Sequence, residues 1–227
     1  MATDHVIEDD TDAKKELARL ERGRLLFAKN AEFMLGVVAL KHLPPADLVE
    51  VSFAGRSNVG KSSLLNALTG QNGLARTSNT PGRTQEVNFF TLGKKGVDGL
   101  YLSDLPGYGY AKVSRSLVKE WTKLLKSYLR GRPNLRRAFV LVDSRHGIKD
   151  SDREIMSMMD ECAVSYQIVL TKVDKLKKTE QEKIVAKTKA AIAKNVAAHP
   201  DIIVTSSAKG DGIAELRAAI ADLVYGN

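Results

Sequence analysis

Eight consecutive residues, from Gly55 to Ser62, have the types and spacing that bind a polyphosphate. They match the pattern G-x-x-x-x-G-K-[ST], with a short apolar segment before them and helix-forming residues after them. The two glycines allow a tight turn in which successive N–H groups point at phosphate oxygens, and the start of a helix adds the positive end of its dipole. Lys61 would bridge the β- and γ-phosphates, while the Ser62 hydroxyl would ligate Mg²⁺. The predicted phosphate loop consists of Gly55, Arg56, Ser57, Asn58, Val59, Gly60, Lys61 and Ser62.

A second motif, Thr171-Lys172-Val173-Asp174, follows an apolar segment and fits the pattern [NT]-K-x-D. The Asp174 carboxylate can accept hydrogen bonds from N1–H and the 2-amino group of guanine, which adenine lacks, so an unpaired carboxylate would reject adenine. The aliphatic stem of Lys172 would lie along the purine face. After the next apolar segment, a backbone N–H is expected to reach guanine O6 from Thr205, Ser206, Ser207 or Ala208. The predicted ligands are therefore GTP and GDP.

A third motif, Asp104-Leu105-Pro106-Gly107, ends a predicted strand and fits D-x-x-G. Asp104 would hold Mg²⁺ through a water molecule, and the Gly107 N–H would meet the γ-phosphate. The polar stretch 72–86 between this motif and the phosphate loop is predicted to order on Mg²⁺ and the γ-phosphate. Thr84 is the preferred second protein ligand for Mg²⁺, with Thr77 and Thr80 left open on composition alone.

Alternating apolar and amphipathic stretches must position these motifs. Strands are predicted at 48–54, 86–92, 99–104, 136–143, 166–171 and 201–206, and helices at 61–69, 115–130, 151–161, 178–197 and 212–224. The alternation indicates a three-layer α/β fold with a mostly parallel six-stranded sheet. Segments 86–92 and 99–104 are joined by a short Gly/Lys turn without a helix, so one strand should run antiparallel.

Three parts of the chain are expected. Residues 1–22 form a charged extension without a clean apolar period, predicted to be disordered or a frayed helix. Residues 23–47 end near Pro44-Pro45 and should pack on the main nucleotide-binding domain, which is predicted to span 48–227.

Composition narrows the class of protein. The apolar and charged fractions, 43% and 27%, are those of a soluble globular protein, and the longest apolar run is too short to span a bilayer. No secretory signal is evident, and one cysteine, Cys162, fits a reducing cytoplasm. The net charge of +8 suits either RNA or a merely charged soluble surface.

The segment 112–137 favours RNA, because it holds nine bases and one acid, Glu120. From Lys112 to Arg130 the bases recur at steps of three and four, so they share one face of a helix, and an apolar face should pack on the core. The apolar residues of that second face are Leu117, Trp121, Leu124 and Tyr128. We expect residues 112–130 to contact an RNA phosphate backbone, and the sequence shows no feature that would recognise DNA specifically. We also expect the protein to be a monomer.

Four strings resemble the EngB (YihA/YsxC) GTPases of bacteria across about residues 25–225. They are Gly55-Arg56-Ser57-Asn58-Val59-Gly60-Lys61-Ser62-Ser63, Pro81-Gly82-Arg83-Thr84-Gln85, Asp104-Leu105-Pro106-Gly107-Tyr108-Gly109-Tyr110-Ala111 and Thr171-Lys172-Val173-Asp174-Lys175. The resemblance implies a P-loop GTPase (Ras-like) fold and Thr84 as the Mg²⁺ ligand. It also implies a role in large ribosomal subunit assembly and in normal cell division and septation. Within the polar stretch 72–86, here called the switch, the residues expected to contact the nucleotide are Gly82, Arg83, Thr84, Gln85 and Glu86. The expected catalytic groups are Lys61, Thr84 and Gly107.

One residue differs from Ras-like proteins, in which a glutamine after D-x-x-G orients the attacking water. Here that position holds Tyr108, so intrinsic hydrolysis should be slow and a partner or ion should complete the site. Asn58 resembles the asparagine of potassium-activated GTPases, which makes K⁺ a candidate activator; the alternative is that Asn58 only shapes the loop. Two other classes were considered, a P-loop ATPase or nucleotide kinase and an RNA-binding module without turnover. The guanine motif disfavours the first, and Tyr108 keeps the second open.

Overall fold

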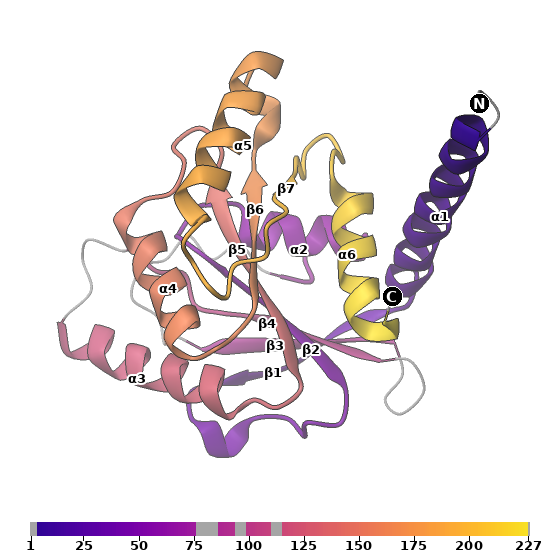
Figure 1. The fold of residues 1–227 in the computed structure, drawn as a ribbon. Coiled ribbons are helices and arrows are strands. Elements are labelled where there is room, and N and C mark those ends of the chain that lie inside the picture. Colours follow the sequence, from indigo (N-terminus) through magenta and orange to yellow (C-terminus); the bar gives the residue numbers. More distant parts are fainter. Residues whose placement is uncertain (1–3, 76–85, 94–98, 110–114, 227) are drawn as a thin grey trace.

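The computed structural model describes residues 4–75, 86–93, 99–109 and 115–226, with the backbone alone for 4–10 and 115–119. Its centre is a seven-stranded sheet in the order β1-β3-β4-β2-β5-β6-β7 (Figure 1). The strands are β1 (Ala31–Val37), β2 (Val49–Gly55), β3 (Val87–Leu92), β4 (Leu100–Asp104), β5 (Leu135–Asp143), β6 (Tyr166–Thr171) and β7 (Ile203–Val204). Only β3 runs against its neighbours, pairing antiparallel with β1 and β4, whereas β4, β2, β5, β6 and β7 are parallel.

Helices cover both faces of the sheet and make three layers. The helices are α1 (Asp4–Phe27), α2 (Lys61–Thr69), α3 (Arg115–Gly131), α4 (Asp150–Glu161), α5 (Lys178–Ile192) and α6 (Ile213–Tyr225), with short 3-10 turns η1 (Leu40–His42) and η2 (Val173–Lys175). Side chains of α1, α2 and α6 share one buried cluster with one face of the strands. Those of α3, α4 and α5 share a second cluster with the opposite face. Because the parallel strands all end at one edge, the loops that follow them are brought together there.

The three-layer fold and its single antiparallel strand are confirmed, but the predicted count of six strands is wrong. The seventh strand, β1, lies at the edge and pairs with β3 from Ala31↔Leu92 to Val37↔Val87. Its burial does not alternate, because Phe33 is 56% exposed while only the ends of the strand are buried. A regular period of two was therefore not available to signal a strand. The helix predicted at 178–197 is also shorter than expected, because α5 ends at Ile192.

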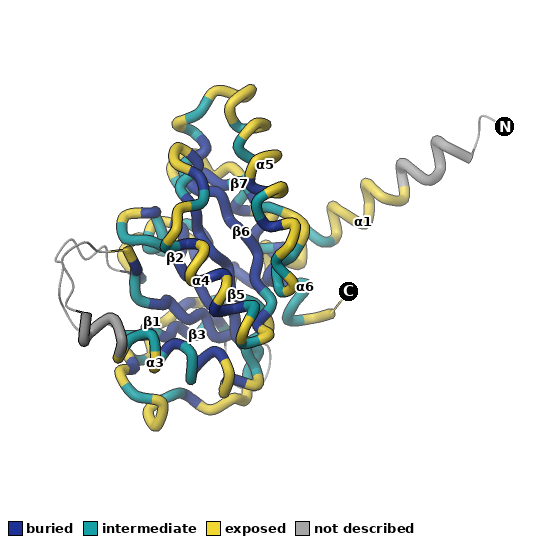
Figure 2. Tube along the Cα trace, turned by 60° about the vertical axis from the view of Figure 1, so that its left-hand side comes forward, coloured by how far each residue is buried: buried dark blue, intermediate teal, exposed yellow. Residues whose placement is uncertain are grey.

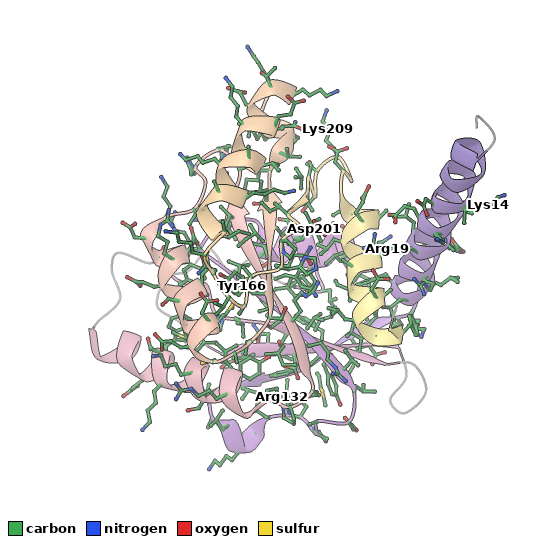
Figure 3. All side chains as sticks on the ribbon, in the orientation of Figure 1. Lys14, Arg19, Arg132, Tyr166, Asp201 and Lys209 are labelled. Atoms are coloured by element: carbon green, nitrogen blue, oxygen red, sulfur yellow. The ribbon has the colours of Figure 1, made fainter. Side chains whose placement is uncertain are left out.

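Residues 1–22 were predicted to be disordered or a frayed helix, and α1 is helical from Asp4 to Phe27, so the helix continues past that boundary. Ion pairs between neighbouring turns of the helix, such as Arg19 with Glu16, are present where an apolar period is missing. The helix is attached to α6 through Asp222, which accepts from Arg19 Nε at 2.6 Å and from Arg22 at 3.4 Å (Arg19 is labelled in Figure 3). Leu26 and Phe27 end the helix inside the core. Figure 2 shows α1 leading away from the body, with residues 11–18 exposed. The proposed boundaries at residues 22 and 47 stay predictions.

A buried charge cluster fastens the end of α3 to the sheet. Arg132 Nε donates to Glu50 Oε2 at 2.7 Å, both side chains are nearly inaccessible, and Arg132 also donates to the Pro44 carbonyl at 2.7 Å. Tyr128 completes the cluster by donating to Glu50 and bonding Ser103 Oγ at 2.8 Å. Burial raises the pKa of Glu50, although the hydrogen bond from Tyr128 and the charge of Arg132 act to lower it. Breaking one partner of such a pair typically costs about 3–5 kcal/mol, so Arg132 serves the fold rather than the basic surface to which the sequence assigned it.

Candidate nucleotide site

The phosphate loop runs from the end of β2 into the first turn of α2, as predicted. Gly60 has φ +105°, a conformation that other L-residues rarely adopt, and its carbonyl accepts from Leu64 N to start the helix. Gly55 is required for a different reason, because a Cβ there would lie 2.8 Å from Val59 Cγ1. Asn58 also has positive φ, 62°, which asparagine tolerates better than most residues. The loop conformation thus follows from its residue types.

Lys61 and Asp104 lie together although 43 positions separate them in sequence. The Lys61 ammonium group contacts Asp104 Oδ1 at the point where β4 ends and α2 begins. Ser62 is the next residue of the same helix, so a hydroxyl, a carboxylate and an ammonium group share one corner of the site. Oxygen ligands of this kind suit Mg²⁺, which is commonly held by one or two protein groups together with substrate phosphates. Among the described residues, no three His, Cys, Asp or Glu side chains gather as a metal centre of their own.

The guanine motif is bonded directly to the phosphate loop. Thr171 Oγ1 donates to the Val59 carbonyl at 2.7 Å, and Lys172 Nζ donates to the Asn58 carbonyl at 2.6 Å. Lys172 adopts φ 59°, and its stem lies near Gly60, where a Cβ would come 3.6 Å from Lys172 Cε. The threonine in the first position of this motif therefore links the two loops by a side-chain hydrogen bond.

Two residues that the sequence analysis missed support Lys172. Asp143, the last residue of β5, accepts from Lys172 Nζ at 2.9 Å and from Arg145 Nε at 2.9 Å. Burial would raise the pKa of Asp143, but the hydrogen bonds from Arg145 and Lys172 outweigh it and hold this pKa well below its usual range. The available signal was positional, because an aspartate ending a parallel strand lies at the edge where ligands bind.

Asp174 is held ready as an acceptor by its neighbours. Ser206 Oγ donates to Asp174 Oδ1 at 2.7 Å, and Lys175 Nζ lies 3.0 Å from Oδ2. These two contacts, Ser206 first, lower the pKa of Asp174, so the group is an anion at neutral pH. The sequence analysis placed Ser206 among the guanine contacts without foreseeing this bond.

The loop after β7 that contains Ser206 is pinned to the end of β6. Thr205 N and Oγ1 both donate to the Leu170 carbonyl, at 2.7 and 3.0 Å. Ser207 is half-buried and Ala208 is exposed, directly after the Ser206 that contacts Asp174. Val173 is buried and its N–H donates to the Thr205 carbonyl at 3.2 Å. The two loops expected to select the base are therefore adjacent.

The D-x-x-G segment packs against the phosphate loop. Leu105 is buried and its N–H donates to the Phe53 carbonyl at 2.9 Å, while Pro106 and Gly107 are half-buried. A Cβ on Gly107 would come within 3.2 Å of Ser57 Oγ, which shows how closely the two segments approach.

The remaining predicted contacts fall in or beside the switch. Gly82, Arg83, Thr84 and Gln85 lie outside the described residues, so the choice of Thr84 stays a prediction. Glu86 is described and half-buried, and a Cβ on Gly36 of β1 would meet its carboxylate, so Glu86 lies over β1.

The chain is similar to GTP-binding proteins along most of its length. A family model described as 50S ribosome-binding GTPase matches residues 50–172, and one described as elongation factor Tu GTP binding domain matches residues 125–225. A Ruegeria pomeroyi protein named "Probable GTP-binding protein EngB" is 63% identical over 203 residues, covering 89% of this chain and 92% of its own length. Proteins of the same name from Rhodospirillum rubrum and Bradyrhizobium diazoefficiens are 60% and 55% identical, covering 92% and 95% of this chain and 92% and 97% of their own lengths.

Solved structures bear on the fold alone, since their identities are low. The crystal structure of a probable GTP-binding protein engB has a TM-score of 0.59 at 21% identity, covering 79% of this chain and 100% of that one. A variant of Aquifex aeolicus Era bound to GDP·AlF4⁻ has a TM-score of 0.63 at 21% identity, covering 80% of this chain and 58% of that one. Within the described part of the chain, none of the helices has the length and apolar content of a membrane span.

Proposed function

Because this chain belongs to the EngB family of GTP-binding proteins and is a GTP hydrolase, we propose that it acts as a guanine-nucleotide switch on the large ribosomal subunit. The observation that carries the proposal is the set of contacts that joins the four described nucleotide motifs at one edge of the sheet. Lys61 meets Asp104, Lys172 meets Asn58, and Ser206 meets Asp174. Such a constellation supports binding of both ends of GTP, the phosphates and the base.

We propose that Mg²⁺ is bound with the nucleotide. Ser62 and the predicted Thr84 would supply hydroxyl ligands, and Asp104 would act through water. When bound, the ion neutralises charge on the β- and γ-phosphates. The protein's own share is the Lys61 ammonium group for the same phosphates and the Gly107 N–H for the γ-phosphate.

The proposed output of the switch is the basic face of α3. Trp121, Leu125, Tyr128 and Leu129 turn inward, whereas Lys123 and Arg130 are exposed. Lys126 is half-exposed and pairs with Glu161 of α4 at 2.9 Å, an interaction worth little at a surface. The bond between Tyr128 and Ser103 ties α3 to the residue just before Asp104. This contact supports communication between the nucleotide and the basic helix.

The biological role that we propose rests on the basic face of α3 and its contact with Ser103. A nucleotide-controlled cationic helix suits an assembly factor that binds ribosomal RNA in one nucleotide state and leaves in the other. We therefore propose a cytoplasmic, monomeric factor for large-subunit assembly, on which normal division and septation depend. The alternative of an RNA-binding module without turnover is disfavoured by the GTPase family, and that of an ATPase or nucleotide kinase by Asp174.

Quantitative co-sedimentation with ribosomal subunits tests this role. With a non-hydrolysable GTP analogue, binding to large subunits is expected to be about 5–150-fold tighter than with GDP, the usual range of coupling between two sites. Small subunits are the control and should bind weakly in both states. Equal binding to large subunits in the two nucleotide states would contradict the switch.

Potassium is the proposed activator that compensates for Tyr108. The positive φ of Asn58 and the bond between its carbonyl and Lys172 show that Asn58 shapes the loop, and K⁺ beside its side chain would add charge at the same place. Single-turnover hydrolysis is expected to be at least about tenfold faster in K⁺ than in Na⁺, which is less than the roughly thousandfold or larger effect of an arginine finger. Equal rates in the two salts would exclude this activator.

A further inference from the structure

Tyr108 does not face the nucleotide side of the loop but is buried among core side chains. Only 7% of it is exposed, and it belongs to the apolar cluster shared with α3 and α4. Its hydroxyl donates to Asp152 Oδ1 of α4 at 2.9 Å. Burial, and then the charge of Asp152, raises the pKa of Tyr108, so the phenol stays protonated and keeps donating.

Asp152 is a fixed acceptor. Its side chain is 1% exposed, and its second oxygen, Oδ2, accepts from the Lys149 backbone N–H at 2.8 Å at the start of α4. Because both carboxylate oxygens are engaged, Asp152 cannot turn without losing the helix cap. The Tyr108 ring is thus anchored to a rigid element rather than to another loop.

The backbone of Tyr108 connects this anchor to the phosphate loop. The Tyr108 carbonyl accepts from Ser57 N at 3.1 Å, and the Tyr108 N–H donates to the Gly55 carbonyl at 3.4 Å. On its other side, Gly109 has φ +80°, and a Cβ there would lie 3.2 Å from Arg56 Nε. One residue therefore joins the phosphate loop, the D-x-x-G segment and α4.

A pocket of about 250 Å³ lies beside this bond, lined in part by Arg56, Asn58, His146 and Asp152, so solvent-sized space adjoins the contact between the phosphate loop and α4. Losing the bond would leave the segment around Gly107 with fewer fixed contacts.

We propose that Tyr108 is a positioning residue whose hydrogen bond to Asp152 holds the Gly107 N–H in place for the γ-phosphate. The residue standing where a water-orienting glutamine is found in Ras-like proteins is here committed to fixing the sensor loop instead. The inference rests on the proposed binding of GTP at this site. It predicts that the bond contributes to GTP affinity and not to GDP affinity, because GDP has no γ-phosphate.

Changing Tyr108 to phenylalanine tests the proposal, since it removes the hydroxyl and keeps the ring. In titrations of the full chain, affinity for a non-hydrolysable GTP analogue is expected to fall about tenfold, as loss of about 1.4 kcal/mol would produce. Affinity for GDP should stay within about twofold of the parent. The matched control is Tyr101→Phe, which removes a 2.9 Å bond from a buried tyrosine to Asp47, a residue outside the nucleotide site.

A double-mutant cycle separates positioning from stability. Asp152→Ala also removes the cap of α4 and should lower the melting temperature, but Tyr108→Phe added to it should not change the ratio of the two affinities further. The proposal is overturned if Tyr108→Phe leaves that ratio unchanged, lowers both affinities equally, or tightens binding of the GTP analogue. If the parent chain itself binds neither nucleotide, the proposed function fails instead, so the two failures are distinguishable.

Discussion

Changing Asp174 to asparagine is expected to lower the affinities for GTP and GDP about a thousandfold and to create affinity for xanthosine nucleotides. The carboxylate is expected to accept from two guanine N–H groups, and hydrogen bonds to a charged group are each worth roughly 1.5–3 kcal/mol. Xanthine carries a carbonyl where guanine has its amino group, so it needs a donor, which the asparagine amide provides. Competition titrations of labelled GDP with GTP, XTP and ATP measure the change.

The structure supplies a control for the same loop cluster. Ser206 Oγ can still donate to the side-chain oxygen of an asparagine at position 174, so the loop should keep its shape. The matched control is Asp211→Asn, which removes the same charge from an exposed residue of this loop. The backbone carbonyl of Asp211 can still accept from Ser206 N, so this variant should leave base preference unchanged. Unchanged preference in the Asp174→Asn variant would refute the assignment of Asp174 as the guanine discriminator.

The parts of the site that the sequence predicted are those set by local pattern. Gly60 at a helix start, Lys61 after it and Asp104 at the end of an apolar strand each carry a role that neighbouring residues indicate. Parallel strands then bring these loops to one edge, so the pairing of Lys61 with Asp104 follows from the fold.

Other contacts depend on tertiary structure and had no local signal. Lys172 was expected along the purine face, but it also donates to Asn58 in the phosphate loop and to Asp143 at the end of β5. Likewise, Tyr108 suggested a missing catalytic group, whereas its role becomes visible only with Asp152 in place, 44 positions later.

Two peripheral elements were predicted least well from the sequence: α1, for which disorder or a frayed helix was expected, and β1, which was not predicted. Propensity and period decide little where an element is stabilised by a few specific contacts. Helix α1 depends on the ion pairs of Arg19 and Arg22 with Asp222 and on the close passage of Gly23 past Ala218, where a Cβ would come within 2.5 Å of a backbone atom. Strand β1 depends on its ladder with β3.

Reversing three charges on α3 is expected to weaken large-subunit binding at least about a hundredfold at physiological salt. The variant is Lys119→Glu, Lys123→Glu and Lys126→Glu; the side chain of Lys119 lies outside those described. If the three lysines neutralise RNA phosphates, the slope of log affinity against log salt should also fall by about 2.7. Co-sedimentation with the GTP analogue over a salt series measures both quantities. GDP affinity should stay unchanged, because Lys123 is exposed and Lys126 pairs with Glu161 of α4 rather than with a nucleotide motif.

The matched control places the same charge change elsewhere. Lys183, Lys187 and Lys189 are exposed on α5, which lies at the far end from α3 in the same helical layer (Figure 1). If binding depends on net charge alone, glutamates at these positions should weaken it as much as those on α3 do. If α3 is the contact, the α5 variant should lose far less, since exposed charges farther from a phosphate than about 8 Å are largely screened. An α3 variant that still binds large subunits like the parent, or equal losses in the two variants, would remove α3 as the output of the switch.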